Sequence, residues 1–243
     1  MSNIVPYFVL TVISVSVLIT VILHQRQFGY FVLFLCYSGM VYVAELFVMV
    51  IGDCYVYKPE VLDIPYYDHI LGAIVSNLFV IPVLGVLTAV YQLRLRWLVG
   101  FAAILVGVEW IFESLGIYYV NWWTKVHTFI AVLLFFLLSK IWMKALLSGK
   151  RGIQFLSLWM QGWGGAATVM YIMSVMGIRY YQFGFFDNPY RDDYFYCRNF
   201  GFDKRIYICR SRLFYPKNTL PYTGASCRFR CRHASVSIWC ACY

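Results

Sequence analysis

Seven acidic, imidazole or amide side chains lie inside or at the ends of long apolar stretches, and their types are suited to chemistry. An ionised group inside a lipid-spanning helix costs about 2.5 to 3.5 kcal/mol on insertion scales. Polar residues kept at such a cost commonly serve ion or substrate pathways, so these seven form the candidate site. They are Glu45, Asp68, His69, Asn77, Glu109, Glu113 and His127.

The spacing of two of these acids adds a constraint. Glu109 and Glu113 are four residues apart and therefore share one face of a helix. Two stacked carboxylates repel if both are ionised, so one must be protonated or a positive group must lie beside them. The pattern predicts an outward-facing polar cavity that binds or transports a cation or protons, with the binding residues Glu45, Asn77, Glu109 and Glu113.

A second interpretation uses the imidazole groups. His69, His127, Asp68 and Glu113 could together supply the nitrogen and oxygen ligands that zinc, iron or manganese accept. The cofactor would then be a divalent metal. The corresponding function is a membrane-embedded enzyme that acts on a lipid, with a carboxylate as general base.

The third interpretation is structural. Small membrane proteins use buried Glu, His and Asn as hydrogen-bonding links between helices, and residues at helix ends can face the lipid headgroups. Asp68 would then serve only as the N-cap of its helix. In that case the chain is a non-catalytic membrane assembly protein, and all three interpretations remain open at this point.

Composition identifies the elements that must position these residues. The chain has 62% hydrophobic and only 13% charged residues, a balance that predicts extensive contact with lipid. A spanning helix needs roughly 20 apolar residues, and we find six such stretches. We therefore expect an all-α, polytopic transmembrane bundle with a lipid bilayer as its main partner. The six stretches are residues 4–23, 28–51, 68–92, 97–120, 126–147 and 153–178.

Positive charge in short loops predicts the orientation of the bundle. The loops after the second and fourth stretches contain only Lys58 and Lys125. They are expected outside, as are both termini, in a multi-pass protein of the cell membrane. The loops expected inside follow the first, third and fifth stretches and contain Arg26, Arg94, Arg96, Lys144, Lys150 and Arg151.

The chain changes character after the last apolar stretch. We expect a transmembrane bundle over residues 1–180 and a basic, Cys-rich tail over 181–243 that is either non-native or poorly ordered. From about Arg205 the composition resembles that of a shifted reading frame, and we assign no nucleic-acid partner to it. A zinc site that includes His233 is one interpretation of its cysteines, and disulfides are the plainer one. The six tail cysteines are Cys197, Cys209, Cys227, Cys231, Cys240 and Cys242.

One stretch resembles a known family. The motifs are Asp68-His69-Ile70-Leu71-Gly72, Ser76-Asn77, Pro82, the segment 109–116, and Leu115-Gly116-Ile117-Tyr118 followed by Asn121-Trp122-Trp123. Over roughly residues 68–142 they resemble uncharacterised small multi-helix membrane proteins of spore-forming Gram-positive bacteria. The resemblance implies a helical bundle in a bacterial cell membrane, and it implies no activity.

Overall fold

The computed structural model describes residues 3–178, 180, 184 and 186–200, and these are α-helical apart from two short strands and the connecting loops. Contacts within the chain define two compact units, residues 1–171 and the part that begins at Ile172. Residues 201–243 lie outside the described residues. The zinc site or disulfides predicted for Cys209 and the later cysteines fall in this part of the chain.

Five helical segments of the first unit are long and apolar enough to cross a membrane, which indicates a multi-pass membrane protein. The sixth predicted stretch also forms a helix, α7 (Arg151–Val175), but Gln154, Gln161 and its glycines make it less apolar than the other five. The five are α1 (Ile4–Gln25), α2 (Gly29–Glu45) with the π-helix η1 (Leu46–Ile51), α3 (Pro65–Ile74) with the π-helix η2 (Val75–Val80) and α4 (Ile81–Val90), α5 (Leu95–Ser114), and α6 (Lys125–Leu147).

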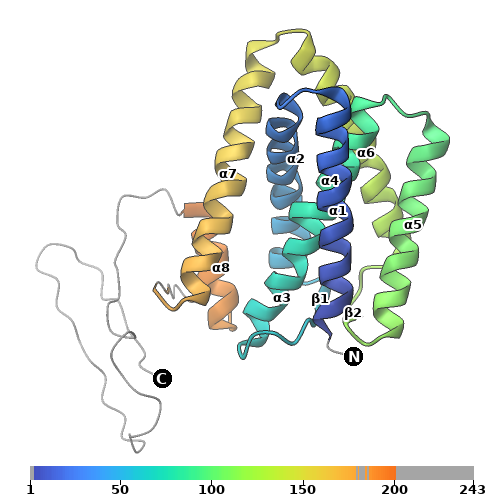
Figure 1. Cartoon of the computed structure of the whole chain (residues 1–243). Coiled ribbons are helices and arrows are strands. Elements are labelled where there is room, and N and C mark those ends of the chain that lie inside the picture. The colour runs from blue at the N-terminus through green and yellow to red at the C-terminus, as the bar shows by residue number, and fades with distance from the viewer. Residues whose placement is uncertain (1–2, 179, 181–183, 185, 201–243) are drawn as a thin grey trace, which may run out of the picture. The chain divides into compact units, whose positions relative to one another are not determined.

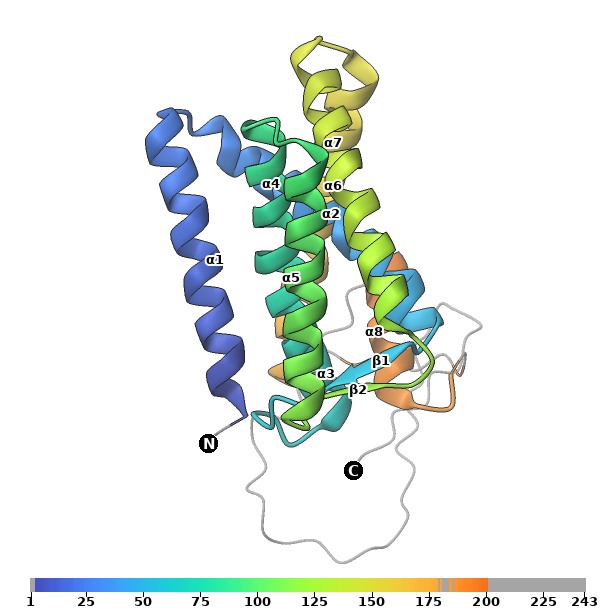
Figure 2. The same cartoon turned by 90° about the vertical axis from the view of Figure 1, so that its right-hand side faces the viewer.

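Helix α4 lies at the centre of the first unit, where it packs against α1, α2 and α6, while α5 packs against α6 (Figures 1 and 2). Helices α1, α5 and α6 leave much of their apolar surface exposed, as expected for helices that face lipid. A buried apolar cluster fills the space between α1, α2 and α4, and we call it the dry core. It contains Leu18, Val21, Leu33, Phe34, Cys36, Tyr37, Val83, Val86 and Ala89.

The fourth predicted stretch was too long at its end. Helix α5 ends at Ser114 because Gly116 adopts a positive φ of 70°, which stops a right-handed helix. The next residues form the strand β2 (Tyr118–Val120), which pairs in antiparallel fashion with β1 (Tyr55–Tyr57) in the loop after η1. Tyr57 lies opposite Tyr118, and β-branched and aromatic residues of this kind favour a strand.

The two ends of the bundle differ in character. The strands lie at the same end as the start of α1, and we call this the ribbon end (Figure 2). The α1–α2, α4–α5 and α6–α7 connections lie together at the opposite end, which we call the basic end (Figure 1). The three connections predicted from their positive charge to share one side are therefore grouped at one end of the bundle.

Two spans depart from regular α-helix next to polar residues. The π-helix η1 follows Glu45 directly, and η2 contains Ser76 and Asn77. Pro82 follows η2 and has no N–H to donate to the carbonyl of Leu78. Ser38 of α2 donates its hydroxyl to that carbonyl at 3.2 Å, which offsets the missing bond. The helix irregularity at this point is therefore a π-helical turn before the proline.

The second unit contains α8 (Pro189–Phe200), a helix that the tail prediction did not include. The side chain of Asn188 caps its start by accepting the backbone N–H groups of Tyr190 and Arg191. Asp193 is buried and accepts a hydrogen bond from Ser174 at 2.9 Å. A short helix with its own cap and buried polar contacts thus follows α7.

Candidate functional site

Two buried carboxylates and a group of tyrosines gather at the ribbon end. Glu45 comes from α2 and Glu109 from α5, and each lies roughly 8–9 Å from the ribbon-end terminus of its span at 1.5 Å per residue. The two predicted acids are therefore at matching depth. The tyrosines, which we call the tyrosine cluster, are Tyr7, Tyr55, Tyr57 and Tyr118.

Glu45 accepts a hydrogen bond from a tyrosine of the ribbon. The hydroxyl of Tyr55 lies 2.9 Å from each oxygen of its carboxylate, and Glu45 is only 6% exposed. Strand β1 brings Tyr55 back over the end of α2, because the connection after η1 reverses the chain direction within a few residues. The contact joins the last regular turn of α2 to the ribbon.

The rings of the tyrosine cluster pack against one another. Ring centroids are 5.5 Å apart for Tyr55 and Tyr57, 5.4 Å for Tyr55 and Tyr118, and 5.0 Å for Tyr57 and Tyr118. Burial raises the pKa of all three ribbon tyrosines well above the usual value, and the nearby charge of Glu45 acts in the same direction. Their hydroxyl groups therefore stay protonated and remain able to donate hydrogen bonds.

Glu109 is buried as well, with 9% of its surface exposed. Within the part of the chain that the structure describes, neither of its carboxylate oxygens has a hydrogen-bond partner. Its polar neighbours are the hydroxyl groups of Thr128 and Tyr118, with the charged groups of Lys125 and Glu113 also acting on it. An unpaired ionised carboxylate in an apolar setting is costly, so this group is suited to take up a proton or another cation.

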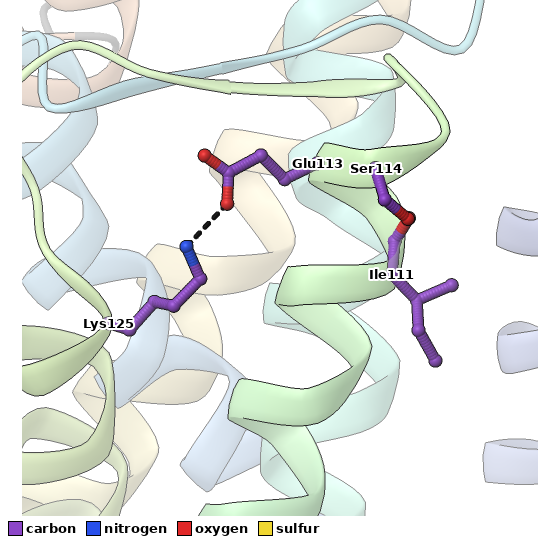
Figure 3. Close-up of polar contacts among 4 residues, drawn as sticks. All are labelled: Ile111, Glu113, Ser114 and Lys125. Atoms are coloured by element: carbon purple, nitrogen blue, oxygen red, sulfur yellow. Dashed lines mark hydrogen bonds and ion pairs between the residues drawn. The ribbon is translucent and has the colours of Figure 1, made fainter.

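Glu113 lies one turn beyond Glu109 and closer to the ribbon end. Its carboxylate pairs with the ammonium group of Lys125 at the start of α6, with 2.5 Å between Oε2 and Nζ (Figure 3). The side chains are 41% and 39% exposed, so this ion pair forms the rim of the site. The spacing of Glu109 and Glu113 predicted either a protonated carboxyl or a positive neighbour, and Lys125, which the sequence prediction had not assigned to this role, is such a neighbour of Glu113.

Asp68 and His69 hold the loop that follows β1. The Asp68 carboxylate accepts the backbone N–H groups of Glu60, Val61 and Leu62 at 2.8–3.0 Å. Nδ1 of His69 accepts the backbone N–H of Tyr57 at 2.9 Å. Asp68 lies inside α3, which begins at Pro65, so its predicted role as N-cap of that helix is wrong. Both side chains are engaged with backbone groups.

His127 has a local role at the start of α6. It forms a capping box with Thr124, whose backbone N–H lies 3.2 Å from its Nδ1. The predicted metal ligands His69, His127, Asp68 and Glu113 are not brought together. Across residues 3–178, 180, 184 and 186–200, no three His, Cys, Asp or Glu side chains gather in an arrangement that could hold a metal ion.

Asn77 belongs to the inner side of the site. It is 2% exposed, and its Oδ1 accepts the hydroxyl of Ser76 at 3.1 Å. The Ser76 hydroxyl also lies 3.3 Å from that of Tyr57. Asn77 is thus connected to the tyrosine cluster through one serine, as expected for a residue in the same polar site.

The tyrosines are the site residues that the sequence prediction missed. Tyr118 is buried, whereas its neighbour Tyr119 is 47% exposed. The alternation of Tyr55, Val56 and Tyr57 is the signal that could have revealed a strand with two tyrosines on one face. Comparisons of the chain with protein-family models, curated proteins and solved structures gave no match.

Proposed function

We propose that this protein binds protons reversibly at Glu45 and Glu109 inside a multi-pass bundle of the cell membrane. The observation that carries the proposal is the buried carboxylate of Glu109, which has polar neighbours but no hydrogen-bond partner among the described residues. Taking up a proton removes the cost of an unpaired charge in an apolar setting.

The surroundings of the two acids favour a proton over a larger cation. The rings of the tyrosine cluster contact one another at centroid separations of 5.0–5.5 Å. A hydrated ion would have to displace these rings, whereas a proton adds almost no volume. The tyrosine hydroxyls remain donors, so they can hydrogen-bond a carboxylate when it is ionised.

A purely structural role for the acids is the second candidate, and the Tyr55–Glu45 contact favours it. One hydroxyl that bonds both carboxylate oxygens ties β1 to α2, and buried polar pairs of this kind connect elements in many membrane proteins. The two candidates differ in one property, since a structural carboxylate keeps one protonation state over the working pH range.

Infrared spectroscopy of the reconstituted full-length protein separates the candidates. A protonated carboxyl has a C=O stretching band that an ionised carboxylate lacks. We expect this band to appear and disappear reversibly with pH and to lose intensity in Glu109→Gln. Glu60→Gln is the matched control, because Glu60 is an exposed acid in the loop after β1 and lies outside the site. A band that does not change with pH, or that is unchanged in Glu109→Gln, would overturn the proposal.

We also propose that α7 is a sixth span. Gln161 donates its side-chain N–H to the carbonyl of Val32 at 2.9 Å, and Thr168 donates to the Tyr42 hydroxyl at 3.3 Å. Because α7 runs beside α2 over this length, it must lie at the same depth in the membrane.

With the basic end in the cytoplasm, six spans put the ribbon end and the N-terminus outside. Protease protection of an epitope placed in the α6–α7 connection tests this orientation: protection from external protease in intact cells is expected, and cleavage there would reverse it.

A further inference from the structure

We infer that the proton site communicates with only one side of the membrane, the side of the ribbon end. This inference rests on the proposed function and adds the direction of proton exchange. The first unit has a half near the ribbon end, the ribbon half, and a half near the basic end. The inference follows from a difference between them in the hydrogen-bond acceptors of the buried hydroxyl groups.

In the ribbon half, polar groups that can both accept and release protons follow one another. The exposed Glu113–Lys125 pair lies one helical turn from Glu109. Glu109 has Tyr118 as a neighbour, and the Tyr118 ring packs against that of Tyr57. The groups that separate the buried Glu109 carboxyl from the exposed rim are therefore ionisable or hydroxyl-bearing side chains.

Charged and titratable groups face Glu109 from several elements. Glu113 is on its own helix, Lys125 is on α6, and Tyr118 and Tyr57 come from the two strands. Glu45 of α2 acts on the same two tyrosines. All of these groups belong to the ribbon half, so the site has its titratable neighbours on one side.

Towards the basic end, the series of hydrogen-bonded polar side chains ends at Asn77. From Tyr57 it continues through Ser76 to Asn77, and an amide side chain does not exchange protons readily at ordinary pH. The next buried hydroxyls, those of Ser38 and Tyr37, each donate to a backbone carbonyl. A backbone carbonyl oxygen carries no proton that it could donate further. Each of these hydrogen bonds therefore ends a possible path for proton transfer.

The same pattern holds in the helices around them. Thr88 of α4 donates to the carbonyl of Gly85, and Ser139 of α6 donates to that of Phe135. In α1, the exposed hydroxyls of Ser16 and Thr20 also donate to carbonyls one turn earlier. The apolar side chains of the dry core fill the space between α1, α2 and α4 at this level. The polar neighbours of Glu109 therefore lie towards the ribbon end, and among the residues that the structure describes a proton bound for the basic end must cross apolar packing.

A side-specific pH jump tests this inference on the full chain. The protein is reconstituted in phosphatidylcholine vesicles with uniform orientation, and the Glu109-dependent infrared band is followed after the external pH is changed. With the ribbon end outward, the band should follow the external pH. With the basic end outward, it should follow the internal pH, with a response to the external jump at least about tenfold slower.

Two outcomes would overturn the inference. One is an equally fast response to a jump at the basic end. The other is a proton leak across the vesicle membrane that exceeds that of protein-free vesicles and is abolished by Glu109→Gln, because such a leak requires a continuous path. In both cases the band still titrates, so the proposed function survives. A band that does not titrate from either side would instead remove the proposed function itself.

Discussion

At the scale of single residues, each buried acid has a different environment. Glu45 is bonded by Tyr55 through both oxygens, while Glu109 has neighbours without a hydrogen bond among the described residues. Glu113, which has the same residue type and lies on the same helix face, is exposed and paired with Lys125. The identity of a residue therefore does not fix its role, which depends on the groups that the fold brings to it.

Tyr55→Phe should lower the stability of the protein. The change removes only the hydroxyl that donates to Glu45 and leaves a buried carboxylate with one partner fewer. We expect a loss of about 1–3 kcal/mol in the free energy of unfolding, measured by thermal or denaturant unfolding in detergent. Tyr119→Phe is the matched control, since Tyr119 is in the facing strand and is exposed. Equal stability of the two variants would contradict the contact.

Cys54 gives a prediction for alkaline pH. Burial raises the pKa of this thiol from 9.0 to about 11, and the charges of Glu45 and Asp53 add to the effect. The unfolded chain releases the proton at lower pH than the folded chain, so stability should fall as pH rises from 9 to about 11. Unfolding temperatures across this window should decline less in Cys54→Ala than in the wild type. Parallel declines would show that the thiol does not contribute.

At the scale of elements, the site depends on a short ribbon that bends back over the helix ends. The backbone carbonyl of Cys54 accepts the N–H of Asn121 at 3.0 Å, and the side chain of Asn121 donates to the carbonyl of Asp53 at 2.8 Å. Trp122 donates its indole N–H to the carbonyl of Gly52. These bonds attach the segment after β2 to the end of the second span and so place Tyr55 and Tyr118 above the two acids.

The contact between α2 and α7 depends on the absence of a side chain at Gly39. A Cβ atom at this position would lie 2.0 Å from the backbone carbonyl oxygen of Met160, so the helices would have to separate. Gly39→Ala should therefore lower the unfolding temperature clearly. Gly100→Ala is the control, because its Cβ would meet nothing within 4 Å, and a helical Gly→Ala change should be neutral or favourable by up to about 1 kcal/mol. A neutral Gly39→Ala variant would contradict this packing.

Much of the element level could be predicted from the sequence, because apolar stretches of spanning length are visible without any tertiary information. All five candidate spans were located, with the main error at the end of α5. The two strands were missed because each has only three residues, and neither is stable without the other. The pairing of Tyr57 with Tyr118 joins segments about 60 residues apart, and hydropathy carries no signal for such a contact.

The site was predicted only in part for a related reason. Glu45, Asn77 and Glu109 stand out as polar residues within apolar helices, and the structure brings all three to the tyrosine cluster. His127 and Asp68 stand out equally well, but they serve a helix start and a loop. A one-dimensional pattern shows that a polar group is buried, and only the fold shows what it faces.

At the scale of the whole molecule, the five candidate spans form a bundle with two unlike halves. Towards the ribbon end, acids and hydroxyl groups are in contact with one another. Towards the basic end, hydroxyl groups donate to backbone carbonyls within an apolar core. A bundle built in this way is suited to take up protons from one side and hold them, and conduction would require its helices to rearrange.

In the proposed proton site, Glu45 and Glu109 change their protonation state while the protein stays folded. The most direct test is the number of protons that the full chain takes up between about pH 4 and pH 10, measured by titration of the wild type and of the Glu45→Gln/Glu109→Gln double variant. We predict that the folded wild type takes up one to two protons per chain more than the double variant, and that it releases them when the pH is returned. Identical titration curves for the two folded proteins would show that neither acid exchanges protons in this range.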